Sequence, residues 1–127
     1  MKGIKLLLVL FLAGSSLSIG AQSLLPPMTD NQSAQLMIKR EITNLELLYK
    51  SIPSVDLERK LYLYQQAMEF LSAPMTQVPS TESAVTSAFL IHEMKWNGIE
   101  ESEAQTKFNN KQWSKEFKDL VNLVKYY

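Results

Sequence analysis

Residues 80–98 read STESAVTSAFLIHEMKWNG, and this stretch carries the clearest helix signals of the chain. Ser80 is a typical N-cap residue, because its hydroxyl can accept a backbone N–H at the start of a helix. Apolar and aromatic side chains then recur at steps of three and four residues, which is the spacing of one helical face. Gly98 follows where a left-handed C-cap favours glycine. We therefore expect one helix from Ser80 or Thr81 to about Asn97.

Two further helices are expected before this stretch, and prolines mark their limits. The first covers about 31–51, is capped by Asp30 or Asn31, and ends before Pro53. The second covers about 55–72 and is broadly apolar, which is typical of a helix that lies between neighbours or presents a face to a partner. A proline-rich loop separates it from the helix at 80–98.

The C-terminal residues 99–127 contain neither proline nor glycine, so two interpretations remain open. They form one long helix, or a short helix at about 102–108 and a longer one from Lys111. We favour the second, because Asn110 is a good N-cap. No alternation typical of a strand occurs in the chain. The predicted fold class is all-α: a small bundle of four main helices plus one short helix.

Residues 1–21 have the composition of a secretory signal peptide. Two lysines precede the apolar run 6–13, and small residues lead to Ala21, after which cleavage is expected. Cleavage after Ser18 or Ser23 is an alternative, and so is a membrane anchor, although serines interrupt the apolar stretch short of the roughly 20 residues that a span needs. The remaining chain divides into an extended N-terminal arm at 22–29 and a single helical domain at 30–127.

Composition excludes several kinds of chemistry. The chain has 127 residues with 13 basic and 13 acidic side chains, and loss of the leader with its two lysines leaves 11 basic and 13 acidic groups, a formal charge of −2. Only one glycine then remains, which excludes glycine-rich phosphate loops. One histidine excludes multi-histidine metal clusters, and the absence of cysteine excludes disulfides, thiolate sites and a lipoprotein anchor. We expect no cofactor and no metal.

His92 and Glu93 are the one pair that resembles acid–base machinery. Adjacent residues on a helix point about 100° apart, and Ala88 and Trp96, four residues either side of the histidine, are neither metal ligands nor nucleophiles. We interpret His92 as a half-buried ring stacked on Trp96. The three glutamates that follow the glycine are interpreted as an acidic first helical turn rather than as catalytic carboxylates; they are Glu100, Glu101 and Glu103.

The C-terminal segment has a basic and aromatic pattern that suggests docking. Its lysines recur at steps of four, four and three residues and then once more; they are Lys107, Lys111, Lys115, Lys118 and Lys125. A continuous helix would bring the first four onto one face. This candidate docking face would suit an envelope protein or an anionic membrane surface. The simpler interpretation is a solvated lysine face opposite a hydrophobic stripe.

A second candidate site is a groove lined by amphipathic and adaptable side chains. Its proposed members are Tyr62, Tyr64, Met68 and Met75. Tyrosine and methionine suit an apolar ligand, and they serve equally well as core residues.

The predicted function is that of an exported, non-catalytic binding protein of the bacterial cell envelope: an accessory subunit, adaptor or inhibitor. The expected location is the periplasm or cell surface of a Gram-negative bacterium, because a cysteine-free domain of this size must rely on packing alone. Its partner would be an envelope protein or a membrane surface, and not nucleic acid. The alternative is a periplasmic carrier or sensor of a small apolar ligand. The oligomeric state stays open.

Overall fold

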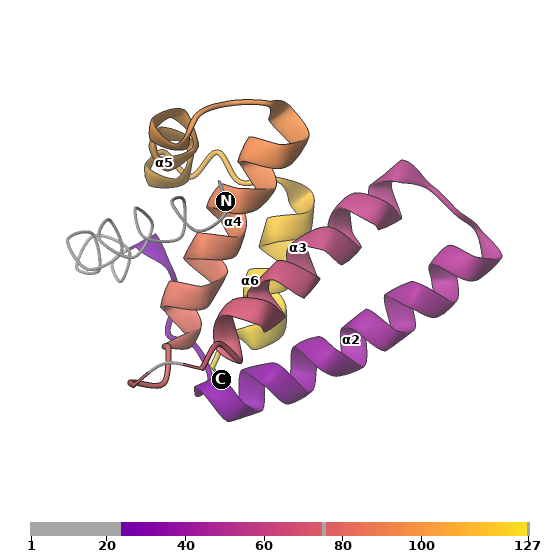
Figure 1. Ribbon diagram of the computed structural model, residues 1–127, viewed down its shortest axis with the longest axis horizontal. Helices are drawn as coiled ribbons and strands as arrows, with labels where there is room; N and C mark the ends of the chain where they lie inside the picture. The colour runs from indigo at the N-terminus through magenta and orange to yellow at the C-terminus, as the bar shows by residue number, and fades with distance from the viewer. Residues whose placement is uncertain (1–23, 75, 127) are drawn as a thin grey trace.

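The computed structural model describes residues 24–74 and 76–126, and these residues form a helical bundle (Figure 1). In chain order the helices are α2 (Asn31–Ser51), α3 (Val55–Leu71), α4 (Thr81–Asn97), α5 (Glu101–Asn109) and α6 (Lys115–Val124). The predicted all-α class, with one short helix among four others, is confirmed. The predicted signal peptide at 1–21 lies outside the described residues.

Side-chain caps fix where most helices begin. The carboxylate of Asp30 accepts the N–H of Ser33 at 2.7 Å, and the hydroxyls of Ser54 and Ser80 accept the corresponding N–H groups of α3 and α4 at 3.1 Å. Gly98 closes α4 in the left-handed conformation, with φ 63°. The predicted limits of these three helices are therefore confirmed to within about one residue.

The last helix begins later than the sequence predicts, so the expected helix from Lys111 with Asn110 as its N-cap is wrong. Asn110 instead ends α5, where its N–H bonds to the carbonyl of Thr106 at 3.0 Å. Lys111 leaves the helix with φ 56°. Ser114 caps α6 by accepting the N–H of Phe117 at 3.2 Å. Residues 111–114 thus form a turn rather than a helical start.

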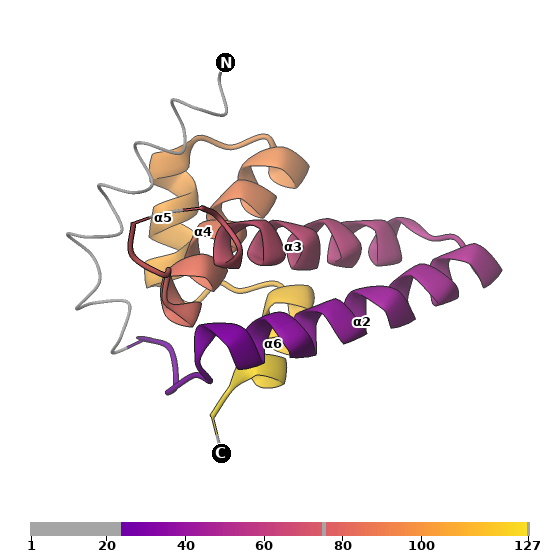
Figure 2. The same cartoon turned by 60° about the horizontal axis from the view of Figure 1, so that its bottom comes forward.

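Helix α4 lies at the centre of the bundle, where it contacts α3, α5 and α6 (Figures 1 and 2). Its Phe89 is fully buried and meets the ring of Phe117 at 4.8 Å and that of Phe108 at 5.5 Å between centroids. Trp113 lies 5.4 Å from Phe117 and donates its indole N–H to the Phe108 carbonyl at 3.1 Å. This aromatic cluster joins α4, α5 and α6, and it explains the turn before α6.

The N-terminal arm is held against the C-terminal end of the chain. Its Thr29 N–H donates to the carbonyl of Val124 at 2.9 Å, and Tyr126 N–H donates to the carbonyl of Pro27 at the same distance. An isolated antiparallel bridge joins Met28 to Lys125. The two ends of the described chain therefore close one side of the bundle.

Helices α2 and α3 form a hairpin that extends beyond the other helices (Figures 1 and 2). In α2 no residue after Leu45 is buried, and in α3 no residue before Leu63 is buried. The fully buried part of the hairpin is therefore its base, where it meets α4 and α6. Its far end is exposed.

The left-handed Lys111 allows a direct test of the C-terminal turn. Because a side chain at positive φ costs about 1–2 kcal/mol, Lys111→Gly should raise the free energy of unfolding by about 1 kcal/mol. The matched change Lys118→Gly, at an exposed position inside α6, should lower it by about 1 kcal/mol. Urea denaturation measures both. Equal destabilisation by the two changes would place Lys111 inside a helix.

Candidate functional site

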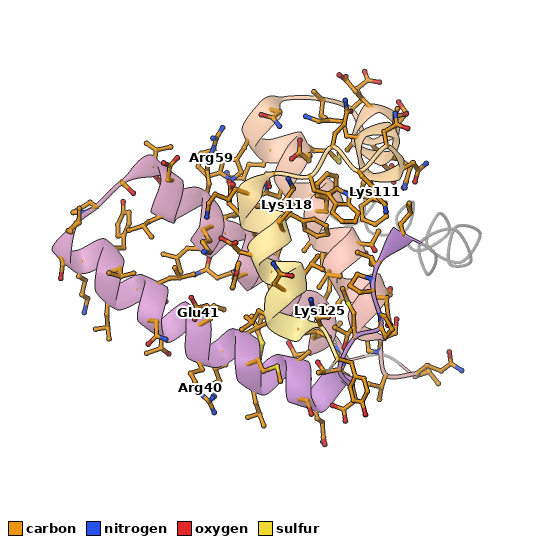
Figure 3. The ribbon with its side chains drawn as sticks, turned by 180° about the vertical axis from the view of Figure 1, so that it is seen from behind. Arg40, Glu41, Arg59, Lys111, Lys118 and Lys125 are labelled. Carbon is orange, nitrogen blue, oxygen red and sulfur yellow. The ribbon has the colours of Figure 1, made fainter. Side chains whose placement is uncertain are left out.

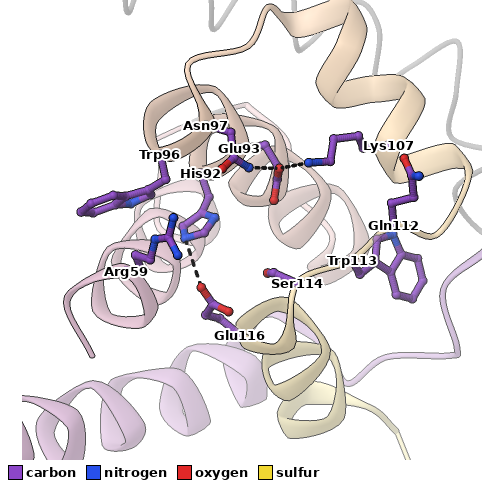
Figure 4. Close-up of a pocket in the computed structure, with 10 residues that line it drawn as sticks. All are labelled: Arg59, His92, Glu93, Trp96, Asn97, Lys107, Gln112, Trp113, Ser114 and Glu116. Carbon is purple, nitrogen blue, oxygen red and sulfur yellow. Dashed lines mark hydrogen bonds and ion pairs between the residues drawn. The ribbon is translucent and has the colours of Figure 1, made fainter. Parts of the chain in front are cut away.

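A polar cleft of about 500 Å³ lies between α3, α4 and the start of α6 (Figure 4). Arg59 enters it from α3, and His92, Glu93 and Trp96 enter it from α4. Lysine and glutamate side chains from α5 and α6 complete the wall. The site therefore collects charged and aromatic groups from four helices.

Glu93 is buried and fully paired. Its side chain is only 4% exposed, and its Oε1 lies 3.0 Å from Lys107 Nζ. The amide of Asn97 also donates to that oxygen at 2.6 Å. A buried carboxylate is stable only when such partners replace its water shell. Glu93 therefore forms an internal ion pair that links α4 to α5.

His92 is more deeply buried than the sequence predicts, with 3% of the residue exposed. Its ring lies 6.4 Å from the Trp96 ring and 6.3 Å from the Tyr62 ring. The predicted neighbour Trp96 is present, but the two rings are tilted by 45°, so the predicted stacking is wrong. Burial lowers the pKa of His92 below its ordinary value, and the nearby carboxylates of Glu116 and Glu93 only partly oppose this. The neutral ring is the form that burial favours.

Three nitrogen atoms around the cleft are buried without a hydrogen-bond partner: Arg59 Nε, His92 Nε2 and Trp96 Nε1. The carboxylate of Glu116 faces His92 Nε2, and its Oε2 is 4.0 Å away. That distance exceeds the usual range of a hydrogen bond. Most buried polar atoms in proteins are paired, so these three are exceptions that call for an explanation.

Of the five lysines predicted to form a docking face, Lys115 and Lys118 are exposed on the same helix, and the other three lie elsewhere. Lys107 pairs with the buried Glu93, and Lys125 lies in the bridge to the N-terminal arm. Lys111 is in the turn before α6. On α6 itself, Lys115 is 87% exposed and lies 3.4 Å from Asp119, while Lys118 is exposed.

Figure 3 shows how this series is spread over the surface. Lys111 lies beside α5, Lys118 lies on α6, and Lys125 lies past the end of α6. The break between α5 and α6 removes the continuous helix that would have aligned Lys107, Lys111, Lys115 and Lys118.

The proposed tyrosine and methionine groove is divided between the core and the cleft edge. Tyr64 is 1% exposed and belongs to the core, where burial raises its pKa. Met68 packs partly buried against the core, and Tyr62 contacts His92 and Trp96. Met75 lies outside the described residues. The described members do not line the polar cleft.

The acidic residues after Gly98 occupy the places that the dipole interpretation assigns to them. Glu100 is the N-cap residue of α5, and Glu101 and Glu103 lie in its first turn. Within residues 24–74 and 76–126, no group of three or more histidine, cysteine or acidic side chains is arranged to hold a metal ion. Over the same part of the chain, no helix has the length and apolar character needed to cross a membrane.

The far end of the α2–α3 hairpin carries exposed apolar side chains, which we call the tip surface. Their exposed fractions lie between 51% and 68%, and they are Leu47, Leu48, Ile52 and Val55. Leu48 and Ile52 are one helical turn apart, and the N–H of Ile52 bonds to the Leu48 carbonyl at 2.8 Å. Val55 follows as the first residue of α3. The tip surface is thus formed by both helices where they meet.

Comparison of this chain with known protein families, with curated proteins and with solved structures found no match.

The buried His92 makes stability depend on pH in a defined direction. Its pKa is lower in the folded protein than in the unfolded chain, so the unfolded chain binds more protons as the pH falls through about 6.5. The free energy of unfolding should therefore decrease from about pH 7.5 to about pH 5. His92→Phe, which keeps a flat ring, should weaken this decrease. Chemical denaturation at the two pH values measures it, and an unchanged slope in the variant would contradict the buried neutral histidine.

Because Lys107 pairs with the buried Glu93, we expect this lysine of the candidate docking face to stabilise the folded protein. Lys107→Gln leaves a buried carboxylate with only the Asn97 amide, so it should lower the free energy of unfolding by about 1–2 kcal/mol. Lys118→Gln, at an exposed position on α6, should change it by less than about 0.5 kcal/mol. Thermal or urea unfolding distinguishes the two. A similarly small change in both variants would mean that the ion pair contributes nothing to the free energy of unfolding.

Proposed function

We propose that this protein is an exported, non-catalytic binding protein of the bacterial cell envelope, and that its partner is another envelope protein docked on the tip surface. The observation that carries the proposal is the exposed apolar end of the α2–α3 hairpin. Soluble proteins seldom leave a contiguous apolar patch exposed unless it meets a partner. The signal-like composition of residues 1–21 supports export.

The form of the hairpin favours docking over simple surface exposure. Leu48, Ile52 and Val55 are more than half exposed, although each has a side chain that is usually buried in a core. The tip also stands away from α4, α5 and α6, so a partner could approach it from several sides (Figure 2). Two helices joined by a short turn present these side chains at one end of the hairpin.

The charges around the tip surface favour a protein over an anionic membrane. The exposed charged residues nearest to it are three acids and one base: Glu46, Lys50, Asp56 and Glu58. An acidic rim is repelled by an anionic lipid surface, to which basic segments are attracted. An apolar centre with a polar rim is the usual arrangement of a protein–protein interface.

The cleft supports the non-catalytic part of the proposal. Its most buried carboxylate, Glu93, is already engaged by Lys107 and Asn97. His92 lies beyond hydrogen-bond distance of Glu116. A general acid or base needs a positioned partner and access to the reacting group. The alternative function, a carrier or sensor of a small apolar ligand, draws no support from this polar cleft, which Tyr62, Tyr64 and Met68 do not line.

Site-directed photo-crosslinking in the producing bacterium tests the docking proposal. The photoreactive residue p-benzoylphenylalanine is placed at position 52 in the full chain or, as a matched control, at position 36, where Leu36 is 66% exposed on the same helix but far from the tip. Position 52 should yield a covalent adduct with one envelope protein, and position 36 should not. The added change Leu48→Ser should reduce the adduct at position 52 several-fold.

Two outcomes would contradict this proposal. One is an adduct pattern that is the same from positions 52 and 36 and insensitive to Leu48→Ser. The other is binding to anionic phospholipid vesicles that disappears when Lys111, Lys115 and Lys118 are all changed to Gln but persists in Leu48→Ser. The second result would identify the lysine series as the docking element and a membrane as its partner.

A further inference from the structure

The unpartnered atoms of the cleft differ in their hydrogen-bond character. Arg59 Nε and Trp96 Nε1 each carry a hydrogen, so both are donors that need an acceptor. His92 Nε2 also lacks a partner, and in a neutral ring this nitrogen is an acceptor when the proton is carried by Nδ1.

The protein itself does not supply the missing groups. Glu93 follows His92 in the sequence and carries a buried carboxylate. This carboxylate is already engaged with Lys107 at 3.0 Å and Asn97 at 2.6 Å. Glu116 stays 4.0 Å from His92 Nε2. Figure 4 shows Arg59 and His92 side by side with Trp96 next to them, and Glu116 facing the histidine across the cleft.

The charges that remain in the cleft balance. Lys107 and Glu93 neutralise each other, and burial favours the neutral form of His92. Arg59 and Glu116 are left, with one charge of each sign. A simple anion would be attracted by Arg59 and repelled by Glu116, and a simple cation would meet the opposite pair of forces. The complement of this arrangement is a small molecule that carries both charges.

We propose that the cleft is a binding site for a free α-amino acid. The ligand carboxylate accepts hydrogen bonds from Arg59 Nε and Trp96 Nε1. The ligand ammonium faces the carboxylate of Glu116 and donates to His92 Nε2 in the tautomer that carries its proton on Nδ1. A volume of about 500 Å³ lies within the usual range of small-molecule sites, roughly 300–1,000 Å³. This site lies in the bundle rather than on the tip surface, so it is independent of the proposed docking.

Nuclear magnetic resonance of the two tryptophan indoles provides a readout with an internal control. The N–H of Trp96 is unpartnered, whereas that of Trp113, also at the cleft, already donates to the Phe108 carbonyl at 3.1 Å. Residues 22–127 contain every described core residue, so this fragment serves as the sample. The common L-α-amino acids are added one at a time at neutral pH. At least one should move the Trp96 indole N–H signal downfield, as a new hydrogen bond requires, and should shift the Trp113 signal much less.

Calorimetric titration of the amino acid identified in this way tests the assigned contacts. Arg59→Gln and Glu116→Gln should each weaken binding about ten-fold or more, since each removes a charged hydrogen-bonding partner. Arg40→Gln is the matched control, because Arg40 is exposed on α2 and lies away from the cleft (Figure 3). Circular dichroism checks that each variant keeps its helices. Acetate and methylamine, which carry one half of the ligand each, should bind at least ten-fold more weakly than the amino acid.

The proposal is overturned if none of the amino acids shifts the Trp96 signal at millimolar concentration, which would indicate a cleft filled by water alone. It is also overturned if acetate binds as tightly as any amino acid, since the site would then be a simple anion site. Equal binding by folded Arg59→Gln and Arg40→Gln would place the ligand elsewhere. None of these results bears on crosslinking at the tip surface.

Discussion

The contact of Phe89 with Phe117 and Phe108 is the interaction on which the rest of the structure depends. It brings the two C-terminal helices onto α4, and Trp113 completes the cluster from the turn between them. The same contact brings Glu116 opposite His92 and sets Lys107 against Glu93, so the wall of the cleft follows from the core. Apolar packing of this kind must carry the fold, since the chain has no cysteine to cross-link it.

The three longer helices could be predicted from the sequence because each carries its own local signals. The helices begin at capping residues that act through local contacts alone, whatever the tertiary structure around them; these are Asp30, Ser54 and Ser80. Gly98 likewise tolerates the left-handed turn that ends α4. The start of α6 could not be predicted in this way. Asn110 and Ser114 are both good caps, and the choice between them is made by the Trp113 indole, which bonds to a carbonyl of the preceding helix. That contact is tertiary and has no local pattern.

The cleft was only partly visible in the sequence. His92 and Trp96 are four residues apart, so their proximity followed from helical spacing. Arg59 and Glu116 come from other helices, and their convergence depends on how α3 and α6 pack against α4. The burial of Glu93 was also missed, because a glutamate on a helix is usually solvated. Glu93 lies one helical turn after the apolar residues Phe89 and Leu90, and this spacing was the available signal. The regular lysine spacing was misleading once the helix broke at Lys111.

The account rests on a bundle that is anchored around Phe89 and leaves the end of the α2–α3 hairpin outside the cooperative core. Native-state hydrogen exchange, followed residue by residue, measures this division directly. Amides in the middle of α4 should exchange only through global unfolding, and amides at residues 46–58 should exchange orders of magnitude faster through local opening. Equal protection of the two regions would contradict the account, because the tip would then be part of the core rather than a surface available to a partner.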